Sequence, residues 1–258
     1  MNTRPATAAD LPALDRLYAH QAGPGAAARA QLPQAEHEHL LLTEDPASGD
    51  LLASVRLRPR IGIGLPRYWY HVGCTVHAAP ELQLFHRQGT LLLGNDHTGA
   101  AELCDWAWAS QDRTLDSQAA ALQRVLQAAL QLARQQRAAL GPQLVVELPG
   151  LRDSAGQSPF WQGLGRHFYR GDPLDAEAKH GADWPSHVAA LLPRHPVLTA
   201  FLPEVAQAAM AQVAPRARLL RELLEAAGLR YSHHIRIHDG GPVLQADLDH
   251  LGPVTAGG

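Results

Sequence analysis

The sequence is poor in cysteine and contains no long apolar run. Its 258 residues include two cysteines, Cys74 and Cys104, which lie far apart and form no C-x-x-C motif. Neither a disulfide scaffold nor a cysteine-based zinc site is indicated, so we expect a reduced, cytoplasmic protein. No stretch reaches the roughly 18 apolar residues that cross a bilayer, and residues 1–18 lack the apolar core of a signal peptide. We therefore expect a soluble protein without a membrane partner.

The sequence also has no large excess of positive or negative charge. The sequence has 22 Lys and Arg against 25 Asp and Glu, which gives a net charge of -3. Such a chain has no overall positive field to attract nucleic acid or an anionic membrane. The expected partners are therefore small molecules or protein subunits. Lysine is almost absent, with Lys179 as the single example, and we interpret this as a compositional bias. The length permits one large domain or two small ones.

Residues 94–108 contain more ionisable side chains than a buried core requires. Residues 91–93 resemble the end of a buried strand, the next three favour a tight turn, and residues 101–109 have the mixed pattern of a second strand. The turn would bring together, near one edge of a sheet, Asp96, His97, Thr98 and Glu102. Because an unpaired buried polar group costs about 1 to 3 kcal/mol, this cluster indicates either a closed hydrogen-bond network or a site of chemistry.

Periodic apolar residues predict helices and strands along the rest of the chain. Helices are expected over residues 11–21 after a Thr7 or Asp10 cap, from an Asp116 or Ser117 cap to Gly141, from Pro159 to Leu164, in short pieces after Trp184, and from Pro215 to Gly228. Strands are expected over residues 40–43, 51–57, 68–75, 101–109, 144–148, 231–238 and 243–248, with one more ending at residue 93. The early strands would form an antiparallel meander, residues 101–148 a strand-helix-strand crossover, and residues 231–248 a terminal hairpin.

Four blocks of residues resemble, in family order, the arginine N-succinyltransferases. They are Tyr70-His71-Val72-Gly73 with Val76-His77-Ala78, Asn95-Asp96-His97-Thr98-Gly99 with Glu102-Leu103-Cys104, Ser158-Pro159-Phe160-Trp161-Gln162 with Leu164-Gly165, and Asp239-Gly240-Gly241-Pro242. The resemblance implies an α/β fold of the GNAT acyltransferase type, with a central mixed, mostly antiparallel sheet flanked by helices. It divides the chain into an acyltransferase core (1–183), C-terminal helices and a hairpin that complete the fold (184–251), and a flexible tail (252–258). The family continues beyond the hairpin, so we expect its last module to be missing.

In the family that the chain resembles, succinyl-CoA acylates the α-amino group of arginine in arginine catabolism. The resemblance implies succinyl-CoA as a cosubstrate, no tightly bound cofactor, arginine or a related amine as acceptor, and homo- or hetero-oligomers with a related subunit. The family's acyl-CoA contacts fall on Trp106 and Arg113. We hypothesise that the strand backbone near Trp106 polarises the thioester and that His97 and Glu102 are the catalytic residues.

We assign substrate binding to Asn95 and Asp96, which could orient a cationic substrate. A turn-capping role fits both residues equally well, because Asn and Asp side chains accept hydrogen bonds from nearby backbone N–H groups. Asp96 would orient or deprotonate the amine together with the two catalytic residues.

The chain departs from the family pattern at three positions with chemical roles. The family's proton-donor histidine falls on Ala214, and two glycines of its cofactor loop fall on Asp116 and Gln118. Glycine permits close backbone approaches that these residues resist. The departures leave a second interpretation open, in which the chain is a catalytically impaired paralogue that serves as a structural or regulatory subunit. A third interpretation is a module that binds arginine without turnover.

Other conspicuous residues have structural interpretations. His37 with His39, and His234 with His238, have strand-like spacings but no cysteine or carboxylate partner at ligand spacing, so we assign no metal site. We interpret Phe160 and Trp161 as core anchors. Cys104 lies in an apolar context typical of a small buried hydrophobe.

Overall fold

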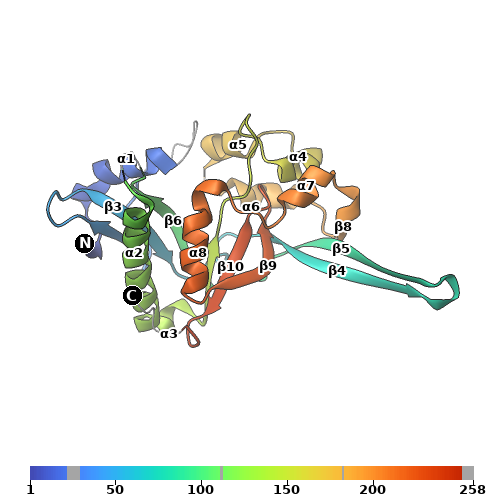
Figure 1. Cartoon of the computed structure of the whole chain (residues 1–258), viewed down its shortest axis with the longest axis horizontal. Coiled ribbons are helices and arrows are strands. Elements are labelled where there is room, and N and C mark those ends of the chain that lie inside the picture. Colours follow the sequence, from blue (N-terminus) through green and yellow to red (C-terminus); the bar gives the residue numbers. More distant parts are fainter. Residues whose placement is uncertain (22–29, 111–112, 182, 252–258) are drawn as a thin grey trace.

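The computed structural model describes residues 1–21, 30–110, 113–181 and 183–251. Within these ranges the chain is organised around one sheet with the strand order β1-β2-β3-β6-β7-β10-β9-β4-β5-β8 (Figure 1). The strands are β1 (Asn2–Pro5), β2 (His39–Glu44), β3 (Leu51–Arg58), β4 (Trp69–Ala79), β5 (Leu84–Gly94), β6 (Ala101–Trp108), β7 (Gln143–Glu147), β8 (Val197–Leu198), β9 (Arg230–Arg236) and β10 (Pro242–Asp247). Neighbours pair antiparallel except β6 with β7. The mixed, mostly antiparallel sheet confirms the predicted fold class.

Helices cover the sheet and close the main core. They are α1 (Leu11–Gln21), α2 (Leu115–Gln135), α3 (Arg137–Leu140), α4 (Pro159–Gly163), α5 (Pro173–His180), α6 (Trp184–Val188), α7 (Glu204–Ala209) and α8 (Arg218–Ala226). The long helix α2 runs beside α8 (Figure 1). Its buried residues Leu122, Val125, Leu126 and Ala129 recur at the spacing of one helix face. They pack with Leu220 and Leu224 of α8 against the sheet.

The crossover from β6 through α2 to β7 creates a gap in the middle of the sheet. Ala101 lies opposite Leu144 and Glu102 opposite Val145, and the parallel pairing ends there. Beyond this point β6 follows β3 as far as Trp108, whereas β7 follows β10. The two strands therefore separate, and beyond Glu102 the β7-facing edge of β6 has no ladder partner among the described strands.

A bulge lies in β6 just beyond the point of separation. Asp105 has a φ of 50°, a left-handed conformation that is uncommon for a residue other than glycine. The register between β3 and β6 shifts at the same place, between Ser54 and Arg56. The bulge turns the Asp105 carboxylate toward Arg56, whose Nε donates to it at 2.6 Å.

Two predictions about the elements are wrong, and one strand was missed. The early strands do not form one meander, because β3 pairs with β6 while β4 pairs with β9 on the other side of the sheet. Strand β1 was not predicted, since its four residues carry no alternating pattern. Helix α2 is capped by Thr114, whose Oγ1 accepts from the Ser117 N–H at 3.3 Å, rather than by Asp116 or Ser117.

The terminal hairpin is in the centre of the sheet rather than at its margin. Strands β9 and β10 lie between β7 and β4, so the last described strands join the two halves of the sheet. Asp239 stabilises the hairpin turn, because its carboxylate accepts from the Gly150 and Gly241 N–H groups, each at 3.0 Å. The predicted tail, 252–258, lies outside the described residues. Among the described helices, none is both long and apolar enough to cross a membrane.

Candidate active site

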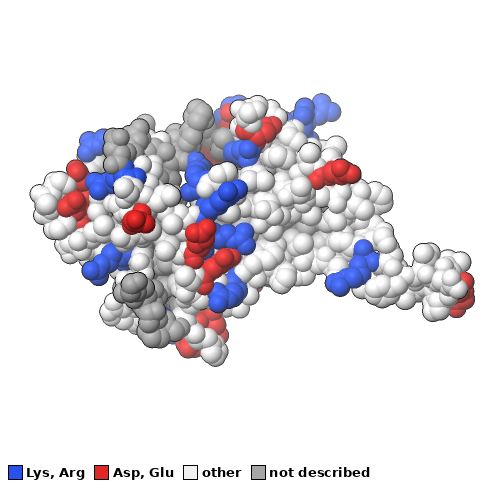
Figure 2. Space-filling model, viewed as in Figure 1, with Lys and Arg blue, Asp and Glu red and all other residues white. Residues whose placement is uncertain are grey.

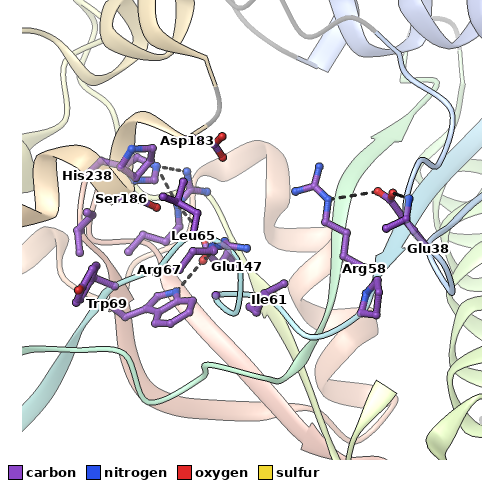
Figure 3. Close-up of a pocket in the computed structure, with 17 residues that line it drawn as sticks. Glu38, Arg58, Ile61, Leu65, Arg67, Trp69, Glu147, Asp183, Ser186 and His238 are labelled. Carbon is purple, nitrogen blue, oxygen red and sulfur yellow. Dashed lines mark hydrogen bonds and ion pairs between the residues drawn. The ribbon is translucent and has the colours of Figure 1, made fainter. Parts of the chain in front are cut away.

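A cleft of about 390 Å³ opens on one face of the sheet beside the gap between β6 and β7 (Figure 3). Val146 of β7 packs in the core under α2. Glu147 follows it and therefore points to the opposite face, into the cleft. The charged residues of the lining come from separate segments of the chain: Glu38, Arg58, Arg67, Glu147, Asp183 and Arg236.

Glu147 is the central anion of the cleft. Its Oε1 accepts from Arg67 Nη2 at 2.6 Å and from Trp69 Nε1 at 2.7 Å. Arg236 Nε lies 3.7 Å from the other carboxylate oxygen. Burial alone would raise the pKa of Glu147, but the charges of Arg67 and Arg236 outweigh it and lower the pKa below the usual range. Glu147 is therefore held ionised, which suits an electrostatic anchor better than a proton acceptor.

Arg67 joins the cleft to the strand where the gap begins. Its Nη1 donates to Glu102 Oε2 at 2.8 Å, so one guanidinium bridges β6 and β7 through Glu102 and Glu147. Burial would lower the pKa of Arg67, but the two carboxylates raise it far above its ordinary value. Both carboxylates are therefore paired with an arginine and neither is an isolated buried charge.

Arg58 and Asp183, which carry opposite charges, are less fully paired and line the open space of the cleft. Arg58 reaches into the cleft from the side of Glu38, whereas His238 and Ser186 lie on the other side, with Asp183 near them (Figure 3). The nearest contacts of Arg58 to Glu38 and Asp105 are 3.6 and 3.5 Å, longer than a direct charged hydrogen bond. Asp183 is exposed at the start of α6 and lines the same space. The cleft is thus lined by an arginine that is held only by these longer ion pairs and by an exposed carboxylate.

The structure brings Asn95, Asp96 and His97 together, but outside the cleft lining. The Asn95 carbonyl accepts from the Thr98 N–H at 2.9 Å, so this segment is the predicted tight turn. His97 is buried against Trp69, with ring centroids 5.1 Å apart. Burial first, and then the neighbouring His234, lower the pKa of His97 to about 4, so its imidazole is neutral at pH 7. Asp96 Oδ2 lies 3.3 Å from His234 Nε2.

The other predicted site residues lie on β6 and in the segment that leads from β6 to α2. Glu102 is 2% exposed and contacts the cleft through Arg67. Trp106 is half-buried beyond the bulge, and its Nε1 donates to the Leu103 carbonyl at 3.2 Å. Arg113 precedes the cap of α2, and its carbonyl accepts from Gln118 Nε2 at 3.1 Å. The two residues before Arg113 lie outside the described ranges.

Ala214 and the two predicted histidine pairs lie in separate parts of the fold. Ala214 is largely buried and its N–H donates to the Pro149 carbonyl at 2.7 Å. His39 contacts Gln136, whereas His234 contacts Asp96, so the two pairs do not meet around a common point.

Phe160 and Trp161 are fully buried core residues, as predicted. Burial raises the pKa of the Cys104 thiol well above its ordinary value, which keeps it protonated.

Sequence reasoning missed the charged residues that line the cleft. Arg58 and Arg236 end strands, and Asp183 precedes a short helix, so each resembles an ordinary surface charge. Glu147 could have been recognised as a site residue from the sequence, because it is a lone carboxylate within the apolar run 144–148. Such a residue needs a buried partner, but the sequence does not say which arginine supplies it.

The parallel pair that separates, the helix crossing between its strands and the cleft beside the gap define a GNAT-type α/β protein. The sequence profile of the family described as AstA, Arginine N-succinyltransferase beta subunit, matches residues 25–252. The chain therefore belongs to the arginine N-succinyltransferase family, as the sequence motifs predict.

Individual relatives agree with this membership. The chain is 35% identical over 226 residues to an arginine N-succinyltransferase of Salmonella arizonae, with 85% of this chain and 63% of the relative covered. A Salmonella paratyphi B protein of the same name is also 35% identical, over 227 residues. The chain thus spans less than two thirds of the length of these curated relatives. A solved structure of arginine/ornithine succinyltransferase subunit AI from Pseudomonas aeruginosa matches with a TM-score of 0.74 and 27% identity, covering 98% of this chain and 78% of that one.

Proposed function

We propose that this chain transfers the succinyl group of succinyl-CoA to the α-amino group of arginine. One observation carries the proposal: a cleft with an available cation and an available anion adjoins the gap between β6 and β7. A volume of about 390 Å³ suits a small polar acceptor. Both cysteines are free thiols, which fits a reducing cytoplasm.

The separated edge of β6 would supply the electrostatic part of the reaction. Beyond Glu102 the N–H groups on this edge have no partner on β7, so they are available to a thioester carbonyl as it becomes an oxyanion. Trp106 and Arg113 lie farther along the same route, on β6 and before α2. We assign them to the acyl-CoA, with the pantetheine arm passing through the gap.

The cleft would hold the acceptor by both of its charged ends. Arg58 is the available cation for the α-carboxylate, and Asp183 the available anion for the guanidinium. Held in this way, the α-amine faces the thioester at the gap. A C–N bond forms as the C–S bond breaks, the amine loses its proton to water, and the CoA thiolate takes a proton from water.

His97 and Glu102 fit positioning roles in this scheme. Glu102 orients Arg67 at the floor of the cleft, and His97 supports the indole of Trp69, which donates to Glu147. Asn95 and Asp96 would fix the turn that holds His97. Attack on the thioester needs the lone pair of the unprotonated amine, so the rate should rise with pH through the pKa of the α-ammonium group.

The proposal is tested by measuring thiol release from succinyl-CoA with three amines. Arginine should be turned over, and fragmentation mass spectrometry should locate the succinyl group on its α-nitrogen. Agmatine lacks the carboxylate and norvaline lacks the guanidinium, so each should show kcat/KM at least about 10-fold lower. Absence of thiol release with millimolar arginine would overturn the proposal and favour the non-catalytic subunit.

A further inference from the structure

The connection between β3 and β4, residues 59–68, forms one wall of the cleft and is anchored at both ends. Near its start, the Ile61 N–H donates to the Ala100 carbonyl at 2.9 Å, and the Ile61 carbonyl accepts from the Gly99 N–H at 2.8 Å. The Ile61 side chain is buried. Near its end, Arg67 is held by its two carboxylate partners. The two ends of the connection are therefore fixed to the sheet and to the turn before β6.

The part of the connection between these anchors, Gly64–Pro66, is held much less firmly, and we call it the rim segment. In the described part of the chain, none of its three residues exchanges a hydrogen bond with another segment. A Cβ added at Gly64 would meet no atom within 4 Å, so the backbone there is not packed against a neighbour. Leu65 lines the cleft, yet it is 36% exposed. A backbone with so few contacts has low local stability, so the position of Leu65 can adjust to a ligand.

The cleft lining is apolar between the two charges that we assign to the acceptor. It includes Pro59, Ile61, Leu65 and Pro185. Leu65 lies on the side of Asp183, and Ile61 lies between that side and Arg58 (Figure 3). An acceptor with a charged group at each end and methylene groups between them matches this order, because apolar lining with a few placed polar groups is typical of small-molecule sites.

We propose that Leu65 covers the methylene chain of the bound acceptor and sets the chain length that the cleft accepts, an inference that rests on the proposed function. With the carboxylate on Arg58 and the guanidinium on Asp183, the chain between them lies under the rim segment. Contact with Leu65 removes apolar surface of both partners from water. An acceptor one methylene shorter cannot meet both charges and fill the space under Leu65. The wild-type chain should therefore favour arginine over 2-amino-4-guanidinobutanoate about 10-fold in kcat/KM.

The neighbouring aliphatic residues Leu65 and Ile63 provide a matched test, because only Leu65 lines the cleft. Ile63 is 66% exposed and lies beside the turn, since a Cβ added at Gly99 would come 4.0 Å from its Cδ1. Leu65→Ala should raise the KM for arginine about 10-fold, whereas Ile63→Ala should leave it within about 2-fold. Leu65→Met nearly conserves volume and should leave it within about 3-fold. Circular dichroism melting of each variant checks that the protein remains folded.

The chain-length preference distinguishes a contact with the acceptor from a general effect on the fold. In Leu65→Ala, the preference for arginine over the shorter acceptor should fall from about 10-fold to below about 3-fold. A substitution that only loosened the protein would lower kcat/KM for both acceptors equally. An unchanged preference in Leu65→Ala, or equal effects of Leu65→Ala and Ile63→Ala, would overturn the proposal.

Hydrogen exchange tests the contact without requiring turnover. Saturating arginine should slow exchange of the Gly64 and Leu65 amides at least about 10-fold, while residues 80–83 at the tip of the β4–β5 hairpin should be unaffected. Such protection without thiol release from succinyl-CoA would support the contact and overturn only the transfer reaction. Transfer to arginine with no protection of these two amides would overturn the contact and leave the proposed function intact.

Discussion

At the scale of single residues, the cleft separates charges that stabilise the fold from charges that are available to a ligand. Glu147 is bound by Arg67 and Trp69 at 2.6 and 2.7 Å. Arg58 approaches no carboxylate closer than 3.5 Å, and Asp183 is exposed. The first group is fixed by direct hydrogen bonds, whereas the second has only longer charged contacts or an exposed carboxylate, and we assign it to the substrate.

Asp183→Asn should weaken the binding of arginine without changing the chemical step. Loss of one charged contact at an exposed position corresponds to about a 10-fold rise in the KM for arginine, with kcat within about 2-fold. Steady-state kinetics measure both constants. Asp175→Asn removes an exposed carboxylate on the neighbouring α5, outside the cleft lining, and should change neither constant. Equal effects of the two substitutions would remove Asp183 from the acceptor site.

Glu147→Gln should destabilise the protein at neutral pH, because it leaves Arg67 and Arg236 without their shared anion. Removing one member of a buried ion pair costs about 3 kcal/mol of unfolding free energy. The lowered pKa of Glu147 means that its stabilisation is complete above the unfolded carboxyl pKa, about 4.3, and is lost as the pH falls toward the lower folded value. Urea unfolding should therefore show the difference between variant and wild type shrinking below about pH 4.3.

A matched substitution controls for the general loss of a carboxylate. Glu222→Gln changes an exposed side chain on α8 and should alter the unfolding free energy by less than about 0.5 kcal/mol at every pH. A pH-independent cost of Glu147→Gln would show that its charge is not what stabilises the cleft.

At the scale of elements, the site depends on a strand pair that separates. Ala101 and Glu102 pair with β7, and the rest of β6 does not. The bulge at Asp105 then changes the direction of the strand. The Asp105 carboxylate lies 2.6 Å from Arg56 Nε and 3.5 Å from Arg58 Nη2. Trp106 follows the bulge, and its half-buried indole packs against the core under α2, beside the route that we assign to the acyl chain.

Trp106→Leu should shift the acyl preference toward longer chains. Leucine is smaller than tryptophan, so the substitution removes the indole from beside β6. The ratio of kcat/KM for succinyl-CoA over acetyl-CoA should rise about 10-fold, the scale expected when a pocket gains room for a few atoms. Trp106→Phe keeps an aromatic ring and should move the ratio less than about 3-fold. An unchanged ratio in Trp106→Leu would place the acyl chain elsewhere.

Local elements were predictable from the sequence, but their neighbours in the sheet were not. The face of α2 follows the i, i+3, i+4 spacing of Leu122, Val125 and Leu126, and the chain adopts it. The hairpin of β9 and β10 was also predicted, yet its place between β7 and β4 depends on contacts between distant residues. The same holds for the cleft, since Arg67 and Glu147 are 80 positions apart. The Asn95–Thr98 turn was predicted, but its separation from the cleft by Trp69 was not.

At the scale of the whole molecule, the cleft and the projecting β4–β5 hairpin lie in different parts of the sheet (Figures 1 and 2). The cleft adjoins β6 and β7, whereas β4 and β5 lie on the far side of the terminal hairpin of β9 and β10. The hairpin of β9 and β10 connects the two regions, because β10 pairs with β7 and β9 with β4.

The central claim is that the gap between β6 and β7 accepts an acyl-CoA, and calorimetric titration with succinyl-CoA tests it most directly. We predict one site per chain with a dissociation constant between about 1 μM and 1 mM, the range typical of enzyme substrates. Free CoA should compete for the same site. Absence of heat with millimolar succinyl-CoA, confirmed at two temperatures, would contradict the claim.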